Sequence, residues 1–284
     1  MKIAEFQKRY KEGERNFRNL DLSGVKSSWL TIRDVDLSGA NFSDSKLCSA
    51  IFTGSILKGA NLARVKLRGA DLRKTDLRES NMSEADLTRA DLIDTNLKQA
   101  NLSGANLNEV TFDRVELQEA NLSNANLSGL SLNGVNLQGS NLSGANIDGV
   151  TFQEANLVGA SLIGLDLSNV NFSGADLRGA NLIDTNLSEA KLYGANLSGA
   201  TLTTAQLGQA KLNGAILDGA DLRDANLNEA EVNWVNLRQA NLGNATFEGA
   251  CLNQANLTGA KVEEAKLCQS ELDEAIVPEG MSCE

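Results

Sequence analysis

A five-residue repeat runs through almost the whole chain and constrains its fold more than any other feature. From Phe17 to Val277 a large apolar residue stands at every fifth position without insertion or deletion, and Ser27 is the single exception among 53 positions. Two places before each centre, from Leu20 to Ala275, the residue is always Ala, Ser, Thr, Val or Leu. A period of five fits neither the roughly 3.6-residue period of an α-helix nor the period of about 2 of a strand. We therefore expect a repeat architecture in which both positions face a narrow interior.

Single repeats carry a recognisable motif of a small residue, Asn or Asp, an apolar centre and two polar or glycine residues. Residues 100–104 read Ala-Asn-Leu-Ser-Gly, and residues 175–179 read Ala-Asp-Leu-Arg-Gly. On these repeats the chain resembles the pentapeptide-repeat proteins, and both of its ends, residues 10–17 and 275–280, are similar to cyanobacterial members. The resemblance implies an all-β fold: a single right-handed quadrilateral β-helix, or pentapeptide-repeat solenoid, with four pentapeptides in each coil.

The unbroken register predicts one solenoid with one continuous core and three segments along the chain. We expect an N-terminal capping helix over residues 1–14, the pentapeptide-repeat β-helix over 15–277 and a C-terminal tail over 278–284. With about 13 coils spaced by ~4.8 Å, the solenoid would be a rod roughly 60 Å long.

The N-terminal segment has the pattern of a short amphipathic helix. Ile3, Phe6 and Tyr10 recur at the spacing of one helix face, and Gly13 suits the end of the helix. Because the first coil of a solenoid exposes apolar side chains and unpaired backbone groups, we expect this helix to cover it. We expect Trp29, on an outward position of the first coils, to pack against the helix.

Charge and hydropathy exclude several classes of partner. With 37 acidic and 26 basic residues the chain has a net charge of −11, which disfavours direct binding to nucleic acid or to anionic membranes. No apolar run reaches the length of a membrane span, and residues 1–18 lack the apolar core of a signal peptide. We expect a cytoplasmic location.

Nothing in the sequence indicates catalysis, and we predict no enzymatic activity, no cofactor and no metal. The chain has no histidine, so the commonest general base and transition-metal ligand are both missing. Asp218, Asp221 and Asp224 could gather at one corner and bind a hard cation, but Asp recurs throughout the repeat as an ordinary motif residue.

The four cysteines are expected to be reduced thiols. Cys48 and Cys268 stand 11 coils apart and cannot meet within one chain. Cys251 and Cys283 could approach only if the C-terminal tail folds back.

Residues 20 apart should stack in columns, which makes the surface readable from the sequence. One column places asparagine in six successive coils, at positions 41, 61, 81, 101, 121 and 141, and predicts a ladder of stacked amides. Another column places Lys26, Lys46 and Lys66 above one another with Arg68 beside the last, and the simplest interpretation is a solvated face.

One surface combines exposed aromatic, cationic and amide groups. Tyr193 and Trp234 fall on the same predicted face, two coils and so ~10 Å apart. Such a mixture is typical of an interaction hot spot. The alternative is that Trp234 merely lies over neighbouring side chains, where Glu231 replaces the usual Asn. The candidate partner-binding residues are Tyr193, Trp234, Lys191, Lys211, Asn213 and Asn233.

Two function classes follow from a non-enzymatic solenoid. The first is an interaction scaffold or regulator that presents flat faces to a protein partner whose identity the sequence does not give, and for it we expect a monomer. The second comes from the family resemblance: an acidic DNA mimic that binds DNA gyrase. Residues 1–214 carry 24 acidic and 22 basic residues whereas residues 215–284 carry 13 and 4, so negative charge is not spread along the chain as a duplex mimic needs. We therefore favour the scaffold.

Overall fold

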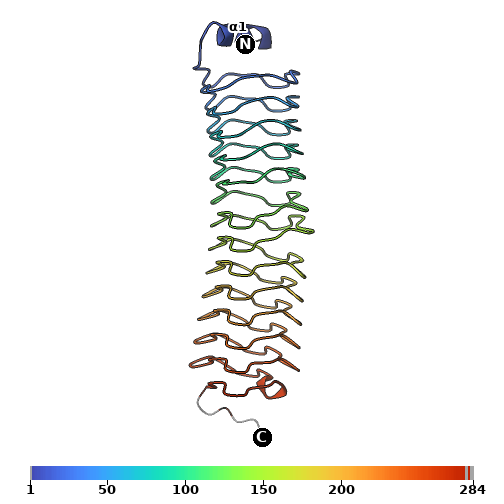
Figure 1. The fold of residues 1–284 in the computed structure, drawn as a ribbon, viewed down its shortest axis with the longest axis vertical. Coiled ribbons are helices and arrows are strands. Elements are labelled where there is room, and N and C mark those ends of the chain that lie inside the picture. The colour runs from blue at the N-terminus through green and yellow to red at the C-terminus, as the bar shows by residue number, and fades with distance from the viewer. Residues whose placement is uncertain (1, 279–280, 282–284) are drawn as a thin grey trace. The chain divides into compact units, whose positions relative to one another are not determined.

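The computed structural model describes residues 2–278 and 281. It contains the α-helix α1, Ile3–Lys11, and the 3-10 helix η1, Leu267–Gln269. Between them the chain winds in coils, and within the described residues neighbouring coils are joined by isolated parallel bridges, without longer strands. In Figure 1 successive coils follow one another in chain order.

Each coil contains four pentapeptides, because every bridge joins residues 20 apart, as in Asn41 with Asn61. Around each bridge the backbone bonds in both directions: the Leu57 N–H donates to the Asp76 carbonyl at 2.7 Å, and the Asn61 N–H donates to the Ala40 carbonyl at 2.9 Å. The regular five-residue period therefore satisfies the backbone without long strands.

Most of the described pentapeptides end in a tight turn that carries the chain round a corner. The Ala60 N–H donates to the Leu57 carbonyl at 3.0 Å, and Gly59 between them has φ of 64°. Glycine adopts this left-handed conformation without steric cost, which explains why it recurs two places after a centre. The geometry also accepts other residues, since Glu79 holds φ of 59° at the equivalent position.

The interior is filled by the two apolar positions of each repeat, as the sequence predicts. Leu127 is 1% exposed and Ala125 is 0% exposed. Phenylalanines at the centres pack against one another, with Phe152 and Phe172 stacked at a centroid distance of 5.1 Å. The side chains of Asp and Glu stay outside this core.

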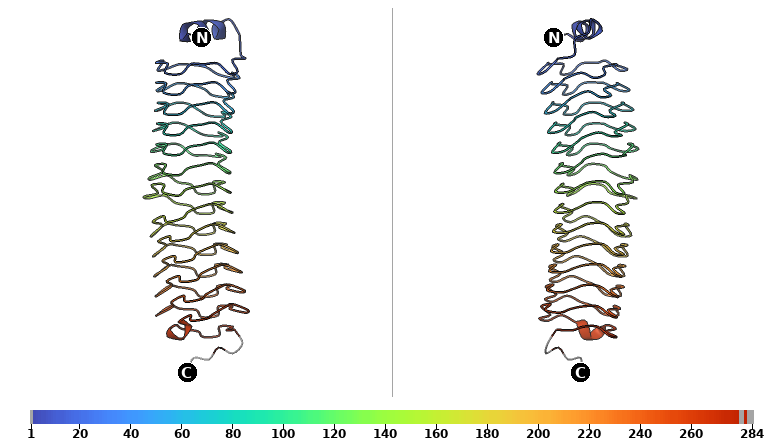
Figure 2. Two further views of the ribbon diagram at one scale, coloured as in Figure 1. Left: turned by 180° about the vertical axis from the view of Figure 1, so that it is seen from behind. Right: turned by 60° about the vertical axis from the view of Figure 1, so that its left-hand side comes forward.

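The contacts divide the chain into two compact units, which are residues 1–131 with 135–149, and residues 132–134 with 150–284. Each unit is a stack of coils in chain order (Figures 1 and 2). The first unit has 19 acidic and 19 basic residues, whereas the second has 18 and 7. The whole net charge of −11 therefore belongs to the second unit, and a single solenoid over 15–277 stays a prediction.

The predicted N-terminal helix is confirmed as α1, which lies over the end of the first coil (Figure 2). Phe6 is fully buried, and its ring meets Phe17 edge to face at 4.6 Å. The hydroxyl of Tyr10 accepts a hydrogen bond from the Arg33 N–H at 3.1 Å, so the helix also satisfies a backbone group of the first coils. These contacts anchor the helix on one side of the coil.

The prediction that Trp29 packs against this helix is wrong. Its side chain is 77% exposed. The helix is positioned by its contact with Phe17, and Trp29 occupies a turn position with φ of 64° at another corner.

The cysteines follow the sequence expectation only in part. Cys48 and Cys251 are free thiols, and both are half-buried. Cys268 is disulfide-bonded, so the prediction of a reduced thiol is wrong there. Cys283 lies outside the described residues.

Within residues 2–278 and 281 no helix has the length and apolar character needed to cross a membrane.

Candidate functional site

The six candidate residues all belong to the second unit and share one face of its coils. Lys191 is bridged to Lys211, and Lys211 is bridged in turn to Glu231, so the two lysines and the glutamate form one column. The Gly194 N–H donates to the Asn213 carbonyl at 3.2 Å, which places the coil of Tyr193 directly against that of Asn213. The structure therefore brings the predicted residues together.

The aromatic side chains are the most accessible apolar groups of this face. Trp234 is 62% exposed and Tyr193 is 39% exposed. The indole Nε1 of Trp234 donates to Oε1 of Gln254 at 2.6 Å, and Nε2 of Gln254 donates to Glu274 at 2.8 Å. The Trp234 ring is thus held by a chain of hydrogen bonds while most of its surface stays open.

The corners that precede Trp234 in its column carry no side chain. They are Gly194 and Gly214, with φ of 60° and 69°. A Cβ atom at either glycine would meet no other atom within 4 Å. The space in front of these two corners is therefore open.

The side-chain amides of Asn213 and Asn233 already form hydrogen bonds within the protein. Nδ2 of Asn213 donates to Oε2 of Glu231 at 2.8 Å, and its Oδ1 accepts the Asn233 backbone N–H at 3.0 Å and Nδ2 at 3.2 Å. Oδ1 of Asn233 accepts the Asn253 N–H at 3.1 Å. The amides act as braces between coils, and the groups left for a partner are Tyr193, Trp234 and the two lysines.

The structure holds Asp221 in an ion pair instead of a cation site. Its carboxylate accepts hydrogen bonds from the Arg223 guanidinium, at 2.8 and 3.1 Å from Nε and at 2.6 Å from Nη2, and these bonds lower the pKa of Asp221. Within residues 2–278 and 281 no group of three or more Cys, Asp or Glu side chains is placed to hold a metal ion.

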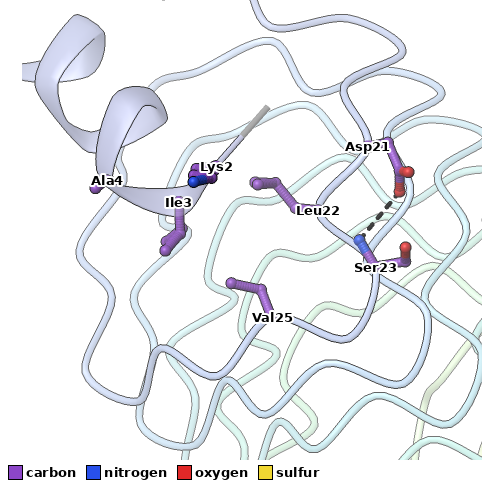
Figure 3. A pocket seen from close by; sticks show the side chains of 7 residues that line it. All are labelled: Lys2, Ile3, Ala4, Asp21, Leu22, Ser23 and Val25. Atoms are coloured by element: carbon purple, nitrogen blue, oxygen red, sulfur yellow. Dashed lines mark hydrogen bonds between the residues drawn. The ribbon is translucent and has the colours of Figure 1, made fainter.

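A pocket at the N-terminal end was not predicted from the sequence. It has a volume of about 500 Å³ and lies between the first turn of α1 and the first coil (Figure 3). Ile3, Leu22 and Val25 supply an apolar wall, and the Ser23 N–H donates to Asp21 at 3.1 Å on its rim. The five-residue repeat does not predict this pocket, because the pocket depends on how far α1 extends over the first coil.

Comparison with known proteins finds the same repeat along the chain. The family model described as pentapeptide repeats matches eight copies, over residues 32–54, 55–92, 166–203, 205–244 and 236–273. A second model, described as a pentapeptide repeat region, matches residues 85–162. No curated protein matches the chain.

Several solved structures are similar to the chain. HetL, a pentapeptide repeat protein involved in heterocyst differentiation regulation from the cyanobacterium Nostoc sp., is 32% identical over 99% of both chains, with a TM-score of 0.41. QnrB1, a plasmid-mediated fluoroquinolone resistance protein, is 22% identical over 74% of this chain and 92% of its own, with a TM-score of 0.39. A pentapeptide repeat protein of the Arabidopsis thaliana thylakoid lumen is 28% identical over 39% of this chain and 67% of its own, with a TM-score of 0.17.

The eight matched copies and the matched repeat region together cover most of residues 32–273. The chain belongs to the pentapeptide-repeat family.

Proposed function

We propose that this chain is a non-enzymatic interaction scaffold or regulator, and that a protein partner binds the face that carries Tyr193 and Trp234. The observation that carries the proposal is the exposed indole of Trp234, which is 62% exposed although its N–H is fixed by Gln254. An aromatic side chain held in one orientation loses little conformational entropy on binding. Trp and Tyr are also the residues most enriched in binding hot spots.

The surroundings favour a protein partner over a small molecule. Lys191 and Lys211 stand beside the aromatic residues, and the asparagine braces keep the coils of this face in fixed register. A rigid, open surface of mixed character suits a flat protein interface, whereas small ligands are usually enclosed in concave pockets. The proposal includes a monomeric chain and a cytoplasmic location.

We also propose a shape and a handedness for the coils. The 20-residue spacing of the bridges supports a four-sided coil, and we propose that the winding is right-handed over residues 15–277. A DNA mimic that binds gyrase is not favoured, because the first unit carries equal numbers of acidic and basic residues.

The test is a binding experiment with a double variant. The purified chain and Tyr193→Ser/Trp234→Ser are immobilised, exposed to a cyanobacterial lysate, and the retained proteins are quantified by mass spectrometry. We expect a specific partner to be retained by the wild type and lost from the double variant. Ile163→Ser/Ile216→Ser is the matched control, because these side chains are 40% and 38% exposed in the same unit but lie outside the candidate surface.

Two results would count against the proposal. Equal recovery of the partner on the wild type and the aromatic variant would place the binding surface elsewhere. Recovery of a gyrase subunit that does not depend on the aromatic pair would favour the DNA mimic.

A further inference from the structure

The first unit carries a second surface, which we call the basic column and define by Lys26, Lys46, Lys66 and Arg68. Parallel bridges join Lys26 to Lys46 and Lys46 to Lys66, so the three lysines stack in successive coils. Arg68 follows Lys66 on the same face, and all four side chains are exposed. This surface is independent of the face around Trp234, because it belongs to the other unit.

The three lysines of the basic column form no ion pair within the described part of the chain, whereas Arg68 interacts electrostatically with Glu109. No ion pair there involves Lys26, Lys46, Lys66 or Arg68, although ten other basic residues of the first unit form one. Asp86 is the next residue of the column, and its Oδ1 accepts the Thr88 N–H at 3.3 Å and hydroxyl at 2.7 Å. Its carboxylate carries a negative charge one coil from Lys66 but forms no ion pair with that lysine in the described residues.

The lysines also displace a hydrogen bond that the fold normally makes. Further along the same column, Oδ1 of Asn106 accepts the Asn108 N–H at 3.1 Å, and Oδ1 of Asn126 accepts the Ser128 N–H at 3.2 Å.

A lysine cannot accept such a bond. Within residues 2–278 and 281 the corresponding N–H groups, of Ser28, Cys48 and Arg68, donate to no protein atom. Three successive coils therefore give up a stabilising contact and stack like charges ~4.8 Å apart. Within the same described residues, Ile51 and Ile56 leave the equivalent N–H groups of Thr53 and Lys58 without an acceptor as well. What distinguishes the lysine column is therefore the stacking of three like charges in successive coils.

The other side chains of this face are small, and the exposed indole of Trp29 lies at one end of it. Beside the lysines stand the small residues Ser28 and Cys48, and Cys48 is a half-buried free thiol. Trp29, 77% exposed, occupies the corner of the same coil as Lys26. A partner would meet a line of positive charge with an apolar anchor at one end.

We propose that the basic column binds an acidic α-helical segment of a partner protein. Two coil steps span about 9.6 Å, from the ~4.8 Å spacing of bridged chains. Carboxylates at i, i+3 or i+4, and i+7 lie on one face of a helix and span about 10.5 Å, from its ~1.5 Å rise per residue. Three lysines therefore meet three carboxylates in register.

Other anionic partners fit less well. In an extended strand the residues of one face recur about every 6.7 Å, so a strand running along the column loses register within two steps. Duplex DNA presents a charge about every 1.7 Å and would also meet a chain whose net charge is −11.

The test uses a fluorescein-labelled Ala/Gln peptide of about 20 residues with Glu at i, i+3, i+4 and i+7 along one helix face. A peptide of the same composition with Glu spread around the helix is the control ligand. We expect the one-face peptide to bind more tightly in fluorescence anisotropy. Lys26→Gln/Lys46→Gln/Lys66→Gln should weaken its binding by about tenfold or more. Lys74→Gln/Lys98→Gln/Lys261→Gln makes the same change in net charge away from the column and should stay within about twofold of the wild type.

The two free thiols locate the bound peptide. Alkylation by iodoacetamide, followed by mass spectrometry, should slow at Cys48 when the one-face peptide is present and stay unchanged at Cys251, which serves as the internal control. The proposal is overturned if the one-face peptide does not bind, if it binds no better than the control peptide, or if the two lysine variants lose affinity equally. Binding of a labelled duplex DNA in place of the peptide would assign the column to nucleic acid instead.

Discussion

Two columns of the same coils differ in the residue at the second position of the repeat. Asparagines in one column bond to one another, whereas lysines in the other form no ion pair in the described residues. Asn41, Asn61 and Asn81 form a ladder in which Nδ2 of each amide donates to Oδ1 of the one before, at 3.1 and 3.4 Å. Five residues after Asn41 in the chain, Lys46 stands between Lys26 and Lys66 with no protein partner for its charge in the described residues. Both columns rest on the same backbone geometry, so their difference lies in the side chains alone.

The comparison separates what holds the coils together from what they offer to a partner. A side chain that accepts the N–H two residues on and donates to the next coil is satisfied within the fold. A lysine at that position supplies neither contact and projects its charge into water. Under our proposals, a partner binds where the amide ladders are absent and the charges stand unpaired.

Breaking the shared core should have the largest effect, because both columns depend on it. Leu127→Lys buries a charge without a partner at a position that is 1% exposed and should lower the free energy of unfolding by about 4 kcal/mol or more. Urea denaturation followed by circular dichroism measures the change. Ser128→Lys, one residue on and half-buried, should cost less than about 1 kcal/mol; an equal loss would contradict the assignment of inward and outward positions.

The contact between α1 and the first coil comes next in size. Phe6→Ala removes a fully buried ring that meets Phe17 at 4.6 Å and should cost about 3 kcal/mol in the first coil. Faster amide hydrogen exchange near Phe17, together with association detected by light scattering, is the expected result. Lys8→Ala, on the exposed side of the same helix, should change neither, and an unaltered Phe6→Ala protein would show that α1 does not stabilise the coil.

Replacing an asparagine of the ladder by lysine tests whether the ladder contributes to stability. Asn61→Lys removes the amide that Asn81 donates to and that donates to Asn41, and also the acceptor of the Ala63 N–H at 3.2 Å. The loss should be about 1–3 kcal/mol in urea denaturation, because several polar groups lose their partners at once. A cost near zero would mean that the ladder contributes little to stability.

Replacing a lysine of the basic column by asparagine tests whether the lysines lower stability and bind the acidic peptide. Lys46→Asn gives the Cys48 N–H an acceptor and removes the middle of three stacked positive charges. The chain should become more stable by about 0.5–1.5 kcal/mol while its affinity for the one-face acidic peptide falls. Lys74→Asn, at a corner, is the control for the change in charge. A stabilised protein with undiminished peptide binding would separate the column from the binding surface.

The sequence predicts the periodic part of this molecule well. The register of Leu127 and Ala125, the ladder through Asn61 and the helix α1 all follow from residue spacing, because each repeats a local rule in coil after coil. The position of Lys46 in its column is predictable for the same reason.

Contacts that do not follow the period are not predictable in this way. Trp29 is exposed because α1 is anchored through Phe6 at Phe17 and through Tyr10 at Arg33, and these contacts lie outside the five-residue period. The bond from Asn213 to Glu231 joins residues 18 apart, not 20, so column stacking alone does not suggest that this candidate amide is already engaged. The candidate surface could therefore be located from the sequence, but the groups it leaves free could not.

The smallest effect concerns a charge that, unlike Lys46, is paired within its own repeat. Two hydrogen bonds from Arg73, at 2.9 and 2.7 Å, hold the pKa of Asp71 at about 2. A carboxyl whose pKa is lowered by folding stabilises the native state above its ordinary value of about 3.9 and loses this contribution as the pH falls toward about 2. Because Arg73 is 46% exposed, solvent screening should limit the contribution to less than about 1 kcal/mol. Asp71→Asn should therefore lower the urea midpoint at about pH 5 and have a much smaller effect at about pH 2, where about half of the native carboxyl groups are protonated. Asp218→Asn, which removes a carboxylate without an ion pair in the described residues, should shift the midpoint at neither pH. A cost of Asp71→Asn that is the same at both pH values would show that the residue acts through its bonds to the backbone rather than through its charge, and the contrast between paired and unpaired charges would then carry no energetic weight at this position.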